Sequence, residues 1–340
     1  MGAVMPDLRV VFRAACGSWR SALAAGVLAA CSTSAALAGS FPERPVTIIV
    51  PFAAGGGSDI AARLIGQRLQ EKFGQPFIVE NKPGASTQIA TRHVITQPGD
   101  GYTLLLATTS VINNDYLYKN LAYDAKKSLQ PVVGIVDVPA FLAVGTAAPV
   151  SSVGEFLEYA RQRSEKNLLN YGSAGNASTL HLAGEWFNQA AKLKGTHVAY
   201  RGSGPAVVAL MAGEVDYSFE NLAPALPQLG EGRMRLLAIA GPERFPTVPD
   251  VPTLKEFGLP DTDLASWFVL MTHADAPAEV VRTLNEAVNE VLQRADVQQR
   301  LLDLGLRPTG GSPQELAQRM EEDRGKWARI IEAGHVTVEQ

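Results

Sequence analysis

The chain has 340 residues, a formal net charge of −4 at pH 7 and a hydrophobic content of 46%. This length suits two domains of ordinary size, and the apolar content is sufficient to build their cores. The absence of a basic block argues against nucleic acid as a partner, because binding its phosphates requires clustered Lys and Arg. Small anions stay possible, since a pocket can hold them with local dipoles.

The N-terminus has the pattern of an export signal. It begins with a positively charged region containing Arg9, Arg13 and Arg20. A mostly apolar stretch at residues 21–30 follows and is too short to span a bilayer. Ala36 and Ala38, on either side of Leu37, form an A-x-A cleavage site that predicts a signal segment at 1–38 and a mature protein starting at Gly39.

A competing interpretation concerns residues 28–31, which have the pattern of a lipoprotein signal and would leave a lipid-modified Cys31 at the new N-terminus. Both interpretations place the protein outside the bacterial cytoplasm, in the periplasm. Cys16 and Cys31 are the two cysteines of the chain, and both lie in this segment. The mature protein is therefore expected to have no disulfide, no thiolate nucleophile and no cysteine-based metal site.

The first part of the mature chain alternates apolar strands with helical patterns. Strands are expected at 46–52, 77–80 and 102–107, and helices at 60–73 and 89–95. This alternation predicts an α/β architecture with mainly parallel strand pairing.

A long apolar run at residues 132–144 can leave one domain and enter another. Ser152 and Glu155 then have the spacing of a capping box, and Pro205 suits the first turn of a later helix. In this part of the chain a helix is expected at 180–191, and strands are expected at 168–171, 197–200, 215–219 and 235–240.

After a connection rich in proline, residues 264–272 read as a second long apolar strand, followed by helical patterns at 278–294, 297–304 and 313–333. The simplest topology has the chain leave and re-enter the first domain. Lobe one would comprise 39–143 plus 264–340, and lobe two 144–263. Two crossing strands would then join the lobes, as in a hinged binding protein.

Three apolar runs stop at a glycine/serine loop that a helical pattern follows, at residues 55–59, 172–176 and 202–205. Each loop would present free backbone N–H groups at a helix N-terminus, which form a neutral cradle for an anion such as a carboxylate. The first loop lacks the Lys-Ser/Thr ending of a phosphate-binding loop and the spacing of a dinucleotide fingerprint. The alternative is a tight turn with Ser58 as the helix N-cap.

Some single residues allow more than one interpretation. Ser173 lies in a pattern close to a hydrolase nucleophile elbow, but Tyr171 replaces the first glycine and His181 is too near in sequence to serve as the base. A hydroxyl hydrogen bond to ligand or to a helix N-terminus is therefore expected of Ser173. Arg201 either pairs with a carboxylate or is a surface or rim charge, and Trp267 either packs in the core or lines the site. The five histidines show no metal-ligand spacing and are expected to be structural: His93, His181, His197, His273 and His335.

Seven motifs occur in a specific order along the mature chain. They are VPFAAGG at 50–56, VENKPGA at 79–85, PGDGYTL at 98–104, NYGSAGN at 170–176, VAYRGSGPA at 198–206, PDVPT at 249–253 and SWF at 266–268. In this order the chain resembles the periplasmic solute-binding proteins of tripartite tricarboxylate transporters, the Bug-type receptors.

The resemblance implies a two-lobed type II periplasmic-binding-protein fold, each lobe being a mainly parallel sheet flanked by helices. It implies a monomer that binds a small organic acid (a di- or tricarboxylate, an amino acid or an aromatic carboxylate) without a cofactor or metal. Membrane permease subunits would receive the ligand. A sensor subunit that presents its closed form to a signalling receptor, and an exported serine hydrolase using Ser173, are the alternatives.

The candidate ligand-binding residues come from both lobes, and the resemblance itself points to Gly55, Gly56, Ser58 and Asp59 of lobe one and to Ser173, Ala174, Asn176 and Ser178 of lobe two. In lobe one they are Ala54, Gly55, Gly56, Ser58, Asp59, Thr108 and Trp267. In lobe two they are Ser173, Ala174, Asn176, Ser178, Arg201, Gly202, Glu220 and Asn221. The chain departs from the family pattern in having 86–88 as Ser-Thr-Gln, where glycine is usual, and Glu220 where aspartate is usual. Both departures can alter the lining of the site, so no particular ligand is inferred.

Overall fold

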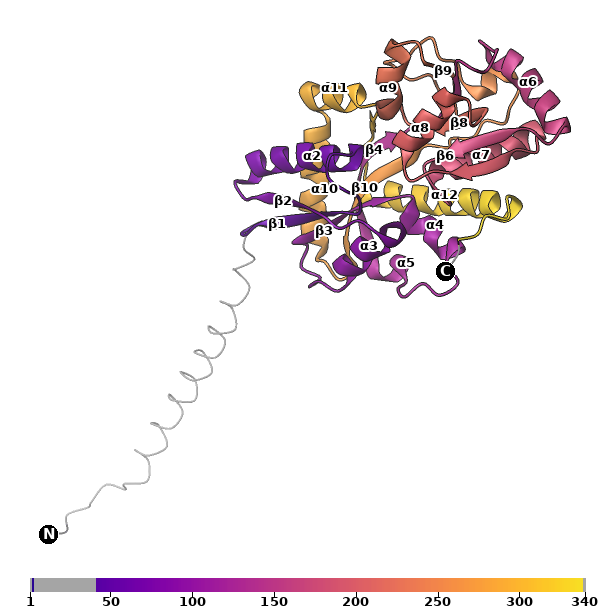
Figure 1. Cartoon of the computed structure of the whole chain (residues 1–340). Coiled ribbons are helices and arrows are strands. Elements are labelled where there is room, and N and C mark those ends of the chain that lie inside the picture. The colour runs from indigo at the N-terminus through magenta and orange to yellow at the C-terminus, as the bar shows by residue number, and fades with distance from the viewer. Residues whose placement is uncertain (1, 3–40, 339–340) are drawn as a thin grey trace. The chain divides into compact units, whose positions relative to one another are not determined.

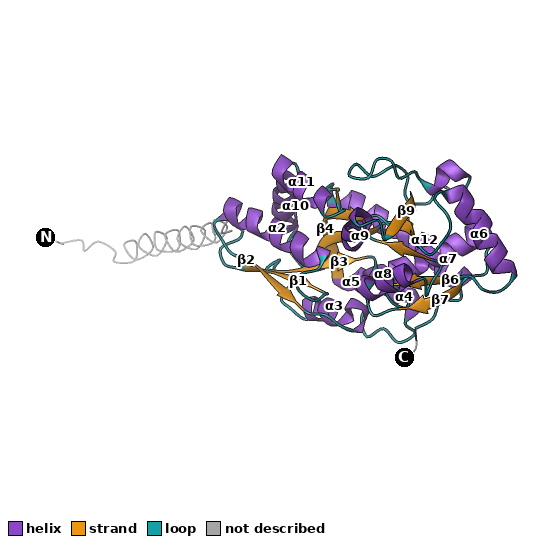
Figure 2. Cartoon of the chain, turned by 45° about the horizontal axis from the view of Figure 1, so that its top comes forward, coloured by secondary structure: helices purple, strands orange, loops and turns teal. Residues whose placement is uncertain are grey.

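The computed structural model describes residues 2 and 41–338. The cleavage site before Gly39 and the alternative at Cys31 lie outside the described residues. Residues 44–338 contain two β-sheets with helices on their faces (Figure 1, Figure 2). Among the described residues, no helix combines the length and the apolar character that crossing a bilayer requires.

The first sheet has six strands in the order β11-β4-β10-β3-β1-β2. Their bounds are β1 Val46–Val50, β2 Phe77–Asn81, β3 Thr103–Thr108, β4 Leu129–Val138, β10 Ser266–His273 and β11 Arg307–Pro308. Strand β1 pairs in parallel with β2 and β3, whereas β10 runs antiparallel to β3 and β4. Residues from distant parts of the sequence therefore share one sheet.

Helices cover both faces of this first sheet (Figure 1). One face carries α2 (Gly57–Phe73) and α10 (Ala278–Leu292), and the other carries α3 (Gln88–Ile95), α4 (Ser110–Leu117) and α12 (Pro313–Ala333). The remaining elements of this part are η1 Ala85–Thr87, α5 Ala125–Ser128 and α11 Ala295–Asp303.

The second sheet has five strands in the order β7-β6-β8-β5-β9. Their bounds are β5 Phe141–Gly145, β6 Asn170–Ser173, β7 Thr196–Ala199, β8 Tyr217–Glu220 and β9 Met234–Ile239. Strand β6 is parallel to β7 and β8, and β5 is antiparallel to β8 and β9. The helices of this part are α6 Val153–Glu165, α7 Thr179–Ala191, α8 Ser203–Ala212, α9 Leu222–Gly230 and η2 Leu254–Phe257.

The chain crosses between the sheets twice. The expected apolar run is interrupted at Pro139 and Ala140, so that β4 belongs to the first sheet and β5 to the second. Backbone hydrogen bonds link the crossings, from Ala240 N to Ala140 O at 2.9 Å and from Leu264 N to Ala240 O at 3.1 Å. The predicted two-lobed α/β fold is confirmed. The pairing is more mixed than expected, because the strands that lead into and out of each lobe run antiparallel to their neighbours. The exact lobe limits stay a prediction.

The long C-terminal helix α12 connects the cores of the two lobes. It contacts α4 and β4 of the first lobe and α7 of the second. Its Trp327 and Ile331 belong to one buried hydrophobic cluster that also includes Ile49 of β1 and Leu182 of α7. Burial of apolar surface therefore stabilises the two lobes together.

Two local expectations about helix starts are corrected. Helix α2 begins at Gly57 with Gly56 as N-cap, so Ser58 lies inside the helix and does not cap it. Ser152 does cap α6 by accepting a hydrogen bond from Glu155 N at 3.3 Å. The Glu155 carboxylate, however, accepts from Ser151 N at 2.7 Å, one residue before the position that a capping box requires.

Candidate functional site: a cleft between the lobes

A cavity of about 560 Å³ lies between the lobes, and residues of both lobes line it. Five helices begin at its wall: α2, α4, α7, α8 and α9. They follow the carboxyl ends of β1, β3, β6, β7 and β8 respectively. Ligands of open α/β sheets bind at these strand ends, where the turns into the next helices create a crevice.

The polar part of the lining consists of uncharged groups. Hydroxyls come from Ser58, Thr108, Ser110, Ser178, Thr179, Ser203 and Ser266. The larger apolar lining residues are Phe52, Val138, Leu180 and Phe268. No charged side chain is among the lining residues within the described part of the chain. Free N–H groups and aligned dipoles at helix N-termini stabilise an anion, while the apolar side chains suit a hydrocarbon body.

The residues expected from the sequence separate into two groups. Seven of them line the cavity: Gly56, Ser58, Thr108, Ala174, Ser178, Gly202 and Asn221. The other eight do not line it: Ala54, Gly55, Asp59, Ser173, Asn176, Arg201, Glu220 and Trp267. Several residues of the second group lie directly behind the lining residues. Their hydrogen bonds hold in place the loops that line the cavity.

Asp59 braces the first loop from within α2. Its carboxylate accepts hydrogen bonds from Gly55 N at 3.0 Å, Arg63 Nε at 3.0 Å and Asn81 Nδ2 at 2.9 Å. Burial alone would raise the pKa of Asp59, but these hydrogen bonds outweigh it and lower the pKa below its usual value. Gly55 adopts a φ of 88°, which favours glycine. Its N–H is engaged by Asp59, and the residues that follow at the start of α2, Gly56, Gly57 and Ser58, line the cavity.

Ser173 ends β6 behind the second loop and is fully buried. Its Oγ accepts from Gly175 N at 3.2 Å and lies 2.7 Å from His197 Nε2. His197 was not expected as a partner of Ser173 from the sequence, in which it is 24 residues away. Parallel pairing of β6 with β7 sets Tyr171 opposite His197. Pairing the two adjacent predicted strands in this way was therefore the signal that could have placed His197 near Ser173.

Hydroxyls and an amide connect the lobes around the cavity. Thr109 Oγ1 is 3.0 Å from Thr179 Oγ1 at the start of α7 and 3.1 Å from Ser266 Oγ in β10. Asn221 donates from Nδ2 to Pro139 O at 3.1 Å, next to a crossing strand. The contacts of Thr109 with Thr179 and of Asn221 with Pro139 join the two walls of the cleft through uncharged hydrogen bonds.

Three further expected residues occupy distinct environments. Arg201 is exposed. Trp267 is buried, and its Nε1 donates to Asp323 Oδ2 at 2.8 Å, whereas its neighbour Phe268 lines the cavity. Glu220 is completely buried, and among the described residues neither of its carboxyl oxygens has a hydrogen-bond partner. Burial raises the pKa of Glu220 to about 8, and the neighbouring Ser218 hydroxyl offsets part of this effect.

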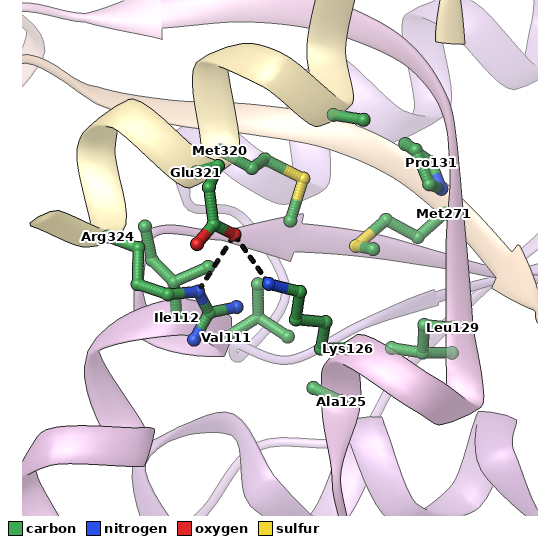
Figure 3. Close-up of a pocket in the computed structure, with 11 residues that line it drawn as sticks. Val111, Ile112, Ala125, Lys126, Leu129, Pro131, Met271, Met320, Glu321 and Arg324 are labelled. Atoms are coloured by element: carbon green, nitrogen blue, oxygen red, sulfur yellow. Dashed lines mark hydrogen bonds and ion pairs between the residues drawn. The ribbon is translucent and has the colours of Figure 1, made fainter. Parts of the chain in front are cut away.

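A second cavity, of about 250 Å³, lies within the first lobe (Figure 3). Its apolar lining includes Met271 and Met320. At one side, Glu321 Oε2 lies 2.9 Å from Lys126 Nζ and 3.6 Å from Arg324 Nε. Its cations are thus already paired with a carboxylate, so the cavity between the lobes is the better candidate for an anionic ligand.

Comparison with known proteins gives a consistent result. The sequence model of a family described as "Tripartite tricarboxylate transporter family receptor" matches residues 61–336. Protein BugT of Bordetella pertussis is 31% identical over 296 residues, covering 86% of this chain and 90% of BugT.

Solved structures show the same similarity in three dimensions. A Rhodopseudomonas palustris protein solved with adipate has a TM-score of 0.79 and 35% identity, covering 88% of this chain and 100% of that protein. MatC from Rhodopseudomonas palustris, solved with bound malate, has a TM-score of 0.73 and 35% identity, covering 86% and 100%.

Proposed function

The chain belongs to the family of tripartite tricarboxylate transporter receptors, and we propose on this premise that it is an extracytoplasmic solute receptor for a small carboxylated metabolite. The ligand would occupy the cleft between the lobes. The observation that carries this proposal is the convergence of five helix N-termini on a cavity whose lining has no charged side chain within the described part of the chain.

Neutral N–H donors suit reversible carboxylate binding. They stabilise the anion without an opposing buried charge, whose desolvation would be costly whenever the cleft opens and the ligand leaves. Hydroxyls of Ser110 and Ser178 can add directed hydrogen bonds from opposite lobes. The apolar lining, including Phe52 and Phe268, would contact the carbon skeleton. The lining residues are accordingly proposed as the binding residues.

Binding and closure are coupled in this proposal. A ligand that contacts both lobes has a higher affinity for the closed form and shifts the equilibrium toward it. The crossings near Ala140 and Leu264 are the segments about which lobes 39–143 plus 264–340 and 144–263 would rotate. The monomeric closed form would then deliver the ligand to membrane permease subunits in the periplasm, or, in the sensor alternative, to a signalling receptor.

A thermal-shift screen tests the ligand class. Adipate and malate are the first acids to try, because related proteins were solved with them. Other mono-, di- and tricarboxylates and aromatic acids complete the panel. A ligand at a hundred times its Kd should add about 2.7 kcal/mol to the free energy of unfolding. If no acid raises the melting temperature and mass spectrometry finds none in natively purified protein, the proposal fails.

One observation favours a second candidate, an exported serine hydrolase: His197 Nε2 lies 2.7 Å from Ser173 Oγ. A base within hydrogen-bond reach is part of such a site. The Ser173 side chain is, however, fully buried and engaged by Gly175. We expect no ester turnover that Ser173→Ala removes, and the appearance of such activity in the parent protein would favour the hydrolase.

A further inference from the structure

A pair of stacked imidazoles lies behind the second loop of the cleft. The rings of His181, in α7, and His197, in β7, have centroids 3.6 Å apart and planes only 6° from parallel. His181 is 4% exposed, and His197 is partly buried. Two positive charges at this separation in a poorly solvated site repel each other strongly, so the pair can accept one proton far more easily than two.

Each imidazole holds one part of the loop at 173–178. His181 Nδ1 accepts a hydrogen bond from Ala177 N at 2.9 Å, which requires this nitrogen to be unprotonated. Ala177 has a φ of 59°, a conformation that alanine rarely adopts without support. On the other side, His197 Nε2 contacts Ser173 Oγ, which also bonds to Gly175. The same loop contributes Ala174 and Ser178 to the cleft.

The groups that face the pair come from three directions. Glu185, one turn along α7, has Oε1 3.6 Å from His181 Nε2, and the Tyr171 hydroxyl donates to the same oxygen. The Tyr171 ring lies 5.0 Å from that of His197 and stacks on Tyr217. The backbone at Gly334, after α12, approaches Glu185 from the outside. Burial, together with the neighbouring His181, lowers the pKa of His197 to about 4, although Glu185 acts in the opposite sense. His197 is therefore neutral at neutral pH.

We propose that His181 and His197 are positioning residues for the cleft, and that proton uptake by this pair loosens the loop at 174–178 and weakens ligand binding. A proton on His181 Nδ1 replaces the acceptor of the Ala177 N–H by a second donor. A proton on His197 sets a cation against the face of the neighbouring buried ring. Both events remove support from residues that line the cleft. The part that concerns the ligand rests on the proposed function.

Hydrogen exchange of the backbone amides tests the proposal without a ligand. Protection of residues 175–178 is measured in the full mature chain between pH 7 and pH 3.5, a range that includes the pKa of His197, after correction for the intrinsic exchange rate at each pH. In the parent protein, the protection factors of these amides should decrease with falling pH once the histidine pair begins to take up its proton. The decrease should approach tenfold per pH unit, which is the limit for a one-proton step. Amides in the last turn of α7, in the same samples, should keep their protection and serve as the internal reference.

A double variant isolates the titration from the hydrogen bonds. In His181→Asn the amide oxygen can replace Nδ1 as acceptor, and in His197→Gln the amide nitrogen can replace Nε2, but neither side chain titrates. We expect the loop of this variant to keep its protection across the pH range. His93→Gln, on α3 in the other lobe, is the matched control and should behave as the parent.

Two results would overturn the proposal. One is that, in the parent protein, the protection of the loop does not change with pH relative to that of the last turn of α7. The other is a double variant that loses protection in parallel with the parent. With adipate as the probe, the affinity of the parent relative to that of the double variant at the same pH should fall with the loop protection, because protonation of adipate itself affects both proteins equally. Absence of adipate binding at neutral pH would exclude adipate as the ligand and would leave the exchange result standing; the proposed ligand class fails only if no acid of the panel binds.

Discussion

The carboxylate of Asp59 accepts a hydrogen bond from the backbone N–H of Gly55 at 3.0 Å, which closes the first loop onto the first turn of the helix that follows it. Arg63 and Asn81 share the same carboxylate. The loop that begins the cleft is thus shaped by a side chain that does not line the cleft. Residues behind the lining determine where the backbone donors point.

Replacing Asp59 should destabilise the protein. Asp59→Ala leaves the Gly55 N–H without its acceptor and removes one of the two acceptors of Asn81 Nδ2, and we expect a loss of about 1–3 kcal/mol in the free energy of unfolding, measured by urea denaturation at pH 7. Because the pKa of Asp59 is lowered in the folded state, its contribution is complete above the unfolded pKa of about 3.9 and is lost as the pH falls through the folded value. The difference between parent and variant should therefore shrink in strong acid.

The control for this prediction is Glu286→Gln, which removes an exposed partner of Arg282 on α10. An exposed ion pair contributes little, so the change should stay within about 0.5 kcal/mol. Equal losses in the two variants would contradict the bracing role of Asp59.

Glu220 should make the stability fall as the pH rises. Its pKa is raised to about 8 in the folded state, so the folded protein retains a proton that the unfolded chain releases above about pH 4.3. The free energy of unfolding then decreases between these values, by at most about 1.4 kcal/mol per pH unit for this group. Glu220→Gln removes the dependence, and its advantage over the parent should grow from pH 5 to pH 8 in urea titrations.

Exposed Glu332→Gln provides the comparison for Glu220, because a solvated carboxylate at the end of α12 has no burial to overcome. It should follow the parent at every pH. A Glu220→Gln variant with the same pH profile as the parent would show that the carboxyl is solvated or paired in solution.

A negative charge placed in the cleft should reduce the affinity for a carboxylate. Ser110 is the first residue of α4 and lines the cavity. Ser110→Asp suits a helix N-terminus, so folding should be retained. Like-charge repulsion at this short range should weaken binding at least about tenfold relative to the shape-matched Ser110→Asn. Calorimetric titration with the acid found in the screen measures the difference, and equal affinities would argue that the anion binds elsewhere.

Two adjacent residues of β10 should give opposite results. Trp267→Phe removes the buried hydrogen bond to Asp323 and should cost about 1–3 kcal/mol of stability while leaving ligand affinity unchanged. Phe268→Ala removes apolar lining and should weaken binding by roughly tenfold. Paired measurements of urea unfolding and calorimetric affinity separate the two roles. Weakened ligand binding in Trp267→Phe would contradict this separation of the two roles.

The sequence predicted the parts of the site that have a local pattern. The three glycine/serine loops do precede α2, α7 and α8, because a strand that ends in small, flexible residues before an amphipathic segment forms such a turn with few alternatives. Helices α4 and α9 also begin at the cavity but were not expected. Helix α4 has no glycine loop before it, and α9 contains Pro224 and Pro227, which disfavour a helix locally, so tertiary packing outweighed local propensity.

The side-chain contacts were less predictable than the loops. Whether Trp267 or Phe268 faces the cleft depends on the register of β10 against β3, which sets Phe268 opposite Thr108. A shift of one residue in this register would exchange the two faces of β10. The sequence of β10 alone does not determine the register. The contact of Ser173 with His197 likewise follows from the pairing of β6 with β7.

The donors at the five helix N-termini belong to the main chain, so a side-chain substitution other than proline leaves them in place. Under the proposed function, Phe52, Leu180 and Phe268 could therefore be exchanged without loss of the groups that hold the anion. The backbone donors are thus independent of the apolar side chains that can vary. Under the proposed function, substitutions at a few apolar positions would change which acid the cleft accepts while the main-chain donors stay in place.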